Sequence, residues 1–260
     1  SIVDRTRHGH VDLPRLIEGR VALQVFSAVT QVPAGINYLR NDSTSDVIVQ
    51  VAVASRWPFR AWTSRTKRAL HMAAKFDAAV ARSGGRLVPI RSSGALSRLL
   101  AQRASQPDLV GGLLSIEGAH AAEEKLGSLE TLYAAGYRMI GLVHFFDNDA
   151  GGSSAGVDQG GLTAFGQAAL TWMEERRVIV DLAHASPTLV DDVLARATRP
   201  VVVSHTGVRG TCDSPRNLSD DALRRISAQG GLVGIGFWEG AVCGLSPDTV
   251  AAAIRHAANM

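Results

Sequence analysis

The sequence has 260 residues, of which 46% are hydrophobic and 20% are charged, and its formal net charge is +3. This composition is that of a globular protein, and a single domain over residues 1–260 is the natural interpretation because α/β barrels alone reach roughly 250 residues. The basic residues are scattered, so we expect no nucleic-acid partner. No apolar run approaches the roughly 18 residues of a membrane span, and residues 1–10 contain no signal-peptide core, which leaves the compartment open.

The N-terminal half contains a few recognisable elements. Residues 20–27 and 86–90 are predicted strands, residues 40–46 a loop, and residues 66–81 a helix by their apolar period. The run "VIVQVAVA" at 47–54 is rich in β-branched residues, and it fits either a strand or a buried helical segment, because periodicity does not decide between them.

From Asp108 onward, apolar runs alternate with segments of helical period. The runs are too continuous for half-exposed strands, and they lie at 109–118, 138–146, 177–186, 199–207 and 231–240. Between them, helices are predicted to begin at Ser186-Pro187, at Ser219 and at Ser246-Pro247, where a capping serine precedes a helical pattern. Alternation of this kind predicts parallel strands covered by helices.

Chemically active side chains follow the predicted strands. They are His10 and Asp12 in "HGHVDLP", Glu117 in "SIEGAH", His144 in "GLVHFF", His184 in "DLAHAS" and His205 in "VVSHTG". A single histidine in such a place is most often a packed core or rim residue. Four of eight histidines at equivalent places are not expected by chance, however, and the carboxyl ends of parallel strands meet on one face. Imidazole and carboxylate are ligands that divalent transition metals prefer.

The spacing also suggests a binuclear site. His10 and Asp12, two residues apart on an extended strand, would project to the same side and hold one ion. Glu117 has two carboxylate oxygens and could bridge this ion to a second one, held by His184 and His205. Two ions about 3.5–4 Å apart can share a hydroxide and polarise a carbonyl or phosphoryl oxygen.

In these motifs, together with "GLTAFGQAAL" and "CDSPRNLSDDALRRI", the sequence resembles the membrane (renal) dipeptidase family of zinc metallopeptidases. The resemblance covers nearly the whole chain. It implies a TIM-type (β/α) barrel that binds two Zn²⁺ ions and hydrolyses dipeptides, with a zinc-bridging hydroxide as nucleophile. By motif, His10 and Asp12 correspond to ligands of one zinc, Glu117 to the bridging carboxylate, and His184 and His205 to ligands of the other zinc.

The resemblance also implies roles outside the metal ligands. His144 corresponds to a histidine that contacts the substrate and assists the tetrahedral intermediate, and Arg216 in "SPRN" corresponds to an arginine that engages the substrate. Without the family context, Arg216 reads as a surface turn residue. The resemblance further suggests a homodimer.

Two features depart from the family pattern. The family usually has Asp where this chain has His8, so the support of His10 is expected to differ. The pattern also continues to a last barrel strand with an acidic catalytic residue, whereas these 260 residues end at Met260 after a predicted helix. We therefore expect the last strand to be missing here. Two alternatives stay open: another binuclear metallohydrolase that acts on a lactone, amide or phosphoester, and a non-catalytic relative that keeps the metal site.

Overall fold

The computed structural model describes residues 2–260. Its strands are β1 (Leu23–Val29), β2 (Leu87–Pro89), β3 (Val110–Glu117), β4 (Tyr137–Gly141), β5 (Ile179–Asp181), β6 (Val202–Thr206) and β7 (Leu232–Ile235). Its helices are α1 (Leu13–Glu18), α2 (Val47–Ala54), α3 (Phe59–Thr63), α4 (Arg65–Arg82), α5 (Ser93–Gln102), the 3₁₀ helix η1 (Ala119–Ala122), α6 (Leu126–Ala134), α7 (Ala164–Glu175), α8 (Pro187–Arg196), α9 (Asp220–Ala228), α10 (Glu239–Val242) and α11 (Pro247–Ala258).

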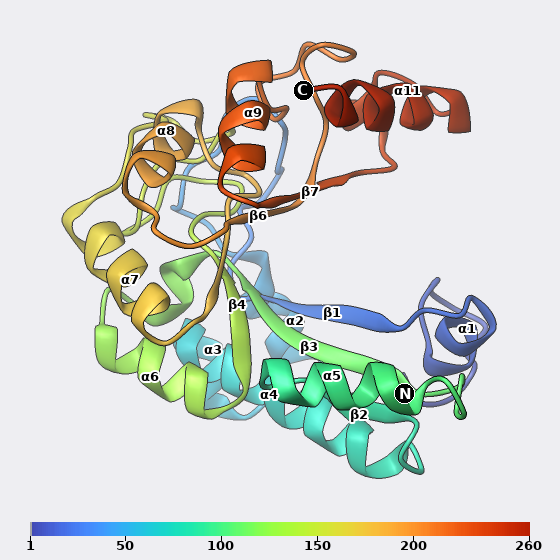
Figure 1. Ribbon diagram of the computed structural model, residues 1–260. Helices are drawn as coiled ribbons and strands as arrows, with labels where there is room; N and C mark the ends of the chain where they lie inside the picture. The colour runs from blue at the N-terminus through green and yellow to red at the C-terminus, as the bar shows by residue number, and fades with distance from the viewer. Residues whose placement is uncertain (1) are drawn as a thin grey trace.

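The strands form one parallel sheet in the order β1-β3-β4-β5-β6-β7. The short strand β2 pairs with the first residues of β3, and β4 pairs with the last residues of the same strand. The sheet curls into a half-barrel with helices α6 to α9 along its outer side (Figure 1). The predicted parallel α/β fold is therefore confirmed. Within residues 2–260, no strand pairing joins β1 to β7, so the described sheet stays open.

The prediction that His10 and Asp12 leave a strand is wrong. The carboxylate of Asp12 accepts the backbone N–H of Arg15 at 3.0 Å and caps α1, and Pro14 occupies the first turn. Asp12 itself has extended backbone angles, φ −150° and ψ 164°, but it precedes a helix and not the end of a strand, because a capping aspartate followed by proline is a helix-start signal. The strand β1 comes only after this helix.

The β-branched run at 47–54 forms the helix α2. Asp46 caps it by accepting the N–H of Ile48 at 3.0 Å, and the buried Arg68 pairs with the same carboxylate. Two of its valines, Val51 and Val53, stay exposed. A cap and a tertiary ion pair therefore decide a conformation that the apolar pattern left open.

The half-barrel has a main hydrophobic core and a smaller second cluster that contains Ile90, Leu99, Leu109, Leu113 and Met139, and a disulfide links two segments of its C-terminal part. Tyr137, at the start of β4, is fully buried and donates its hydroxyl to the carbonyl of Ala69 in α4 at 2.7 Å. A disulfide joins Cys212, in the segment after β6, to Cys243 at the end of α10. Among residues 2–260, no helix combines the length and the apolar character needed to cross a bilayer.

Candidate metal centre

Four of the predicted site residues meet at the carboxyl ends of neighbouring strands. Glu117 is the last residue of β3, His144 and His184 each come three residues after the ends of β4 and β5, and His205 lies near the end of β6. Because all strands of the sheet are parallel, their carboxyl ends share one rim. The apolar strands therefore deliver one carboxylate and three imidazoles to one place.

The distances define a compact cluster around one carboxylate oxygen. Glu117 Oε1 lies 2.9 Å from His184 Nε2, 3.3 Å from His205 Nε2 and 3.6 Å from His144 Nε2. The Nε2 atoms of His184 and His205 are 3.0 Å apart. Candidate ligand atoms of Glu117, His144 and His184 all lie within 4.8 Å of one another. This donor set, with imidazole nitrogens and a carboxylate oxygen converging, fits a divalent transition metal such as zinc.

The electrostatics keep these side chains in the forms that bind cations. Burial lowers the pKa of His184 well below its ordinary value, and nearby Arg216 lowers it further. Burial likewise lowers the pKa values of His144 and His205. Burial alone would raise the pKa of Glu117, but its hydrogen bond with His184 and the neighbouring histidines bring it to about 2. At neutral pH the site therefore holds neutral imidazoles and a charged carboxylate.

A chain of hydrogen bonds from Asp181 through Ser204 orients His205. The hydroxyl of Ser204 donates to Asp181 Oδ2 at 2.5 Å and lies 2.9 Å from His205 Nδ1. Because the single hydroxyl proton goes to Asp181, the Nδ1–H of His205 must donate to Ser204. The lone pair of the neutral ring is then on Nε2, which faces Glu117, as a metal ligand requires. Asp181 and Ser204 are not among the residues predicted from the sequence, although both lie within the quoted strand motifs.

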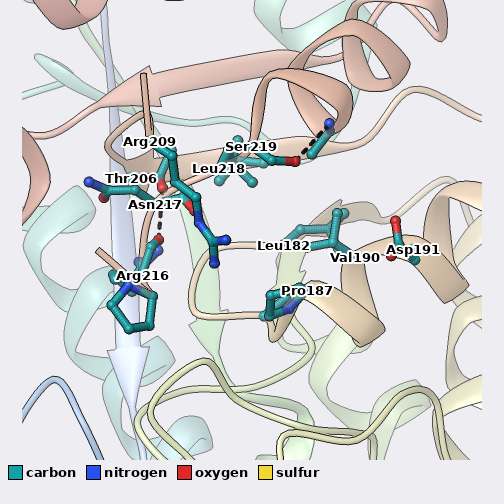
Figure 2. A pocket seen from close by; sticks show the side chains of 14 residues that line it. Leu182, Pro187, Val190, Asp191, Thr206, Arg209, Arg216, Asn217, Leu218 and Ser219 are labelled. Carbon is teal, nitrogen blue, oxygen red and sulfur yellow. Dashed lines mark hydrogen bonds between the residues drawn. The ribbon is translucent and has the colours of Figure 1, made fainter. Parts of the chain in front are cut away.

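Arg216 is buried beside this cluster and is poorly satisfied. Its side chain is 5% exposed, so the surface-turn interpretation is wrong. Nη2 donates to the carbonyl of His205 at 2.9 Å, and Nε is buried with no partner among residues 2–260. Burial lowers the pKa of Arg216 to about 10, because the charged form is poorly solvated there. The side chain also borders a small cavity of about 70 Å³ between β6, α8 and α9 (Figure 2).

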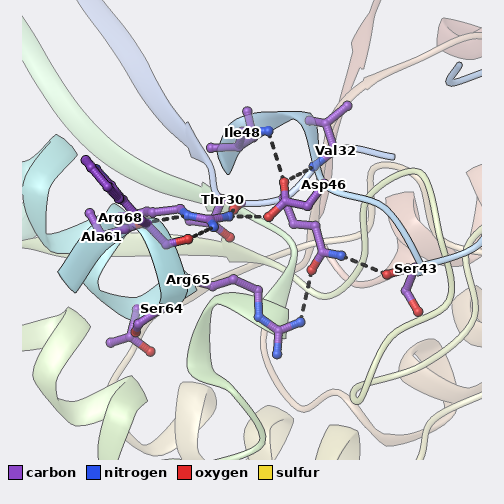
Figure 3. A network of polar contacts seen from close by, with 12 residues as sticks. Thr30, Val32, Ser43, Asp46, Ile48, Ala61, Ser64, Arg65 and Arg68 are labelled. Carbon is purple, nitrogen blue, oxygen red and sulfur yellow. Dashed lines mark hydrogen bonds and ion pairs between the residues drawn. The ribbon is translucent and has the colours of Figure 1, made fainter. Parts of the chain in front are cut away.

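Arg68, in α4, shows what a buried structural arginine looks like in the same protein. It donates to the carbonyls of Thr30, Ala61 and Trp62 at 2.7–2.8 Å and pairs with Asp46 (Figure 3). All three nitrogens of that guanidinium therefore donate hydrogen bonds within the fold. Arg216, by contrast, keeps a buried Nε–H with no partner among residues 2–260, as a group that binds an anionic ligand would.

The structure does not bring His10 and Asp12 to the cluster. Both precede α1, which lies at the amino end of β1 (Figure 1), whereas Glu117 pairs with Val29 at the carboxyl end of that strand. A strand of this length spans roughly 20 Å at about 3.3 Å per residue. His10 is exposed, and Asp12 is occupied by Arg15 and by the N–H of Thr6. In this structure these two residues therefore do not adjoin Glu117, and the ion that they were predicted to share with it stays a prediction.

The family model for "Membrane dipeptidase (Peptidase family M19)" matches residues 2–260. The chain belongs to this family. The resemblance identified from the sequence motifs is thus confirmed. An uncharacterized dipeptidase from Schizosaccharomyces pombe is 27% identical over 235 residues, which cover 88% of this chain and 51% of that protein. The chain spans about half the length of this curated relative.

Solved structures of dipeptidases share the fold. Dipeptidase AC, a metallopeptidase of the M19 family, is 22% identical with a TM-score of 0.78, over 97% of this chain and 73% of that one. A metallopeptidase from Rhodobacter sphaeroides, liganded with a phosphinate mimic of L-Ala-D-Ala, is 22% identical with a TM-score of 0.75, over 98% and 74%. The probable dipeptidase PvdM from Pseudomonas aeruginosa is 24% identical with a TM-score of 0.69, over 92% and 56%.

Proposed function

We propose that this M19 chain carries the active site of a zinc-dependent dipeptidase and that its half-barrel belongs to a TIM-type barrel. The observation that supports this proposal is the convergence of Glu117 with His144, His184 and His205 at the rim of the sheet. We assign Glu117, His184 and His205 to zinc binding. A zinc ion held there supplies a Lewis acid that polarises the peptide carbonyl and lowers the pKa of a water molecule.

His144 and Arg216 act on the substrate in this proposal. His144 lies 3.6 Å from Glu117, close enough to the metal ligands to donate a hydrogen bond to a carbonyl oxygen as negative charge develops on it. Arg216 offers a buried, unsatisfied Nε–H, and its planar fork suits the carboxylate of a dipeptide. The negative charge of a carboxylate would also stabilise the guanidinium cation, which burial leaves poorly solvated.

Two further elements of the sequence-based prediction remain predictions. One is a second zinc ion, held by His10 and Asp12 and bridged by Glu117; it would require these two residues, which lie at the amino end of β1 in this structure, to approach Glu117. The homodimer suggested by the family resemblance can be checked by sedimentation equilibrium.

The test combines metal analysis with a substrate panel. We expect the purified chain to bind zinc and to hydrolyse dipeptides, and we expect His144→Ala to keep zinc while it loses turnover. Loss of zinc in His144→Ala would make His144 a ligand instead. Zinc binding without hydrolysis of any dipeptide would contradict the proposal and favour a non-catalytic relative. Turnover only of lactones, other amides or phosphoesters would favour another metallohydrolase.

A further inference from the structure

A second cavity lies at the opposite end of the sheet from the metal centre. It has a volume of about 510 Å³, within the range of roughly 300–1,000 Å³ that is usual for small-molecule sites. Its apolar wall includes Leu23 and Ile179, the first residues of β1 and β5, together with Leu113 of β3. The amino ends of the strands therefore surround a space large enough for a small ligand.

Five arginines line this cavity. They are Arg91, Arg138, Arg176, Arg177 and Arg199, and within residues 2–260 the lining includes no aspartate or glutamate. They come from three separate parts of the fold: the β2–α5 connection with the start of β4, the α7–β5 connection, and the α8–β6 connection. The whole chain has a formal net charge of only +3, so five cations around one cavity are a marked local concentration.

The ion pairs of the fold neutralise only part of this charge. Arg91 pairs with Asp77 at 2.7 Å, and Arg176 pairs with Glu130 at 3.3 Å. In the part of the chain that the structure describes, the guanidinium groups of Arg177 and Arg199 have no acidic partner, although the backbone N–H of Arg199 donates to Glu174 Oε1 at 3.1 Å.

Arg138 is held in place without any acid. Its guanidinium stacks on the ring of Tyr133 at 3.7 Å and donates to the carbonyls of Arg91, Tyr133 and Tyr137 at 2.7–2.8 Å. Burial lowers the pKa of Arg138, and neighbouring Arg91 lowers it further. The cavity therefore contains one fixed, half-buried cation and two unpaired ones.

The start of α5 adds to the same positive field. Ser92 and Ser93 line the cavity, and the first turn of this ten-residue helix contains no acidic residue. The side chain of Ser92 already caps Ala95, which leaves the hydroxyl of Ser93 and the first helical N–H groups available. An anion near this helix start would also be favoured by the helix dipole.

We propose that this cavity binds a small anion with two or more phosphate or carboxylate groups. Arginine forks match the paired oxygens of both groups, and arginines on three sides favour a ligand that presents negative charge in more than one direction. The site is separate from the metal centre, and its existence does not depend on the dipeptidase activity.

Isothermal titration calorimetry with pyrophosphate tests the proposal, with citrate and inorganic phosphate as further probes. The double variant Arg177→Gln/Arg199→Gln removes two cations that have no ion pair in the fold, so folding should be unaffected. The matched control is Arg60→Gln/Arg255→Gln, which removes two exposed, unpaired cations from α3 and α11. Both double variants carry the same net charge, so any general effect of charge or of metal chelation by the probe is the same.

We expect Arg177→Gln/Arg199→Gln to raise the Kd for pyrophosphate by about tenfold or more, and the control to change it by less than about twofold. Tighter binding of pyrophosphate than of citrate would identify phosphate as the ligand group, and the reverse would identify carboxylate. Equal Kd values in the two double variants, or no binding to the unmodified chain at about 10 mM pyrophosphate, would overturn the proposal.

Discussion

Replacing Arg216 by methionine should separate stability from activity. Burial lowers the pKa of Arg216 from its ordinary value to about 10, which corresponds to a cost of about 3 kcal/mol for the charged form. The side chain is charged at pH 7, so the folded state carries this cost at every pH below about 10, and the cost is relieved only as the pH rises through that value.

Methionine removes this cost and also removes the hydrogen bond to the carbonyl of His205, which contributes about 1 kcal/mol. We therefore expect Arg216→Met to be at least as stable as the unmodified chain at pH 7, and more stable by up to about 2 kcal/mol. Two lost charge-assisted hydrogen bonds to a dipeptide carboxylate should lower kcat/KM by about 10- to 100-fold or more.

Urea unfolding at pH 7 and dipeptide kinetics measure the two effects. Arg68→Met is the matched control, because Arg68 is equally buried but fully satisfied by three carbonyls and Asp46. Breaking that buried pair should cost about 3–5 kcal/mol. The reasoning is refuted if Arg216→Met loses as much stability as Arg68→Met and keeps its kcat/KM, since Arg216 would then be a structural residue.

Three other predictions concern the metal centre and its surroundings. His184→Ala should lose zinc, measured by metal analysis, and dipeptide hydrolysis together, whereas His10→Ala should keep the zinc ion held by Glu117, His184 and His205, because His10 is exposed and lies at the other end of β1. Gly118→Ala should lower the free energy of unfolding, measured by urea titration, by about 3 kcal/mol or more. The reason is that Gly118 has φ +104° and an added Cβ would lie 2.2 Å from the buried ring of His120. An unchanged urea midpoint would contradict this prediction. Burial lowers the pKa of His120 to about 3. Between about pH 6.5 and pH 3, His120 is therefore protonated in the unfolded chain but not in the folded chain. The free energy of unfolding should fall by up to about 1.4 kcal/mol for each pH unit in this range as the pH decreases. His120→Gln should reduce that slope in urea titrations at several pH values, and an identical slope in the variant would count against it.

The sequence alone was enough to predict that the four residues of the candidate metal centre lie close together. Glu117, His144, His184 and His205 each follow or end a continuous apolar run, and runs of that kind form buried parallel strands. Parallel strands place their carboxyl ends on one rim whatever the details of packing, so residues nearly 90 positions apart were expected to meet. The secondary structure around His10 and Asp12 was predicted wrongly, because the same short sequence is compatible with a strand end and with a helix cap. Only the packed chain shows that Asp12 caps α1.

Tertiary structure decided the features that depend on neighbours distant in the sequence. The tautomer of His205 depends on Asp181 through Ser204, the burial of Arg216 depends on the packing around β6, and the arginine cavity gathers residues from 91 to 199. Hydrogen-bond satisfaction and desolvation are set by which groups become neighbours in space. A periodic pattern along the chain records which face of an element is apolar, and so it predicts strands and their ends, but not the partners that tune each side chain.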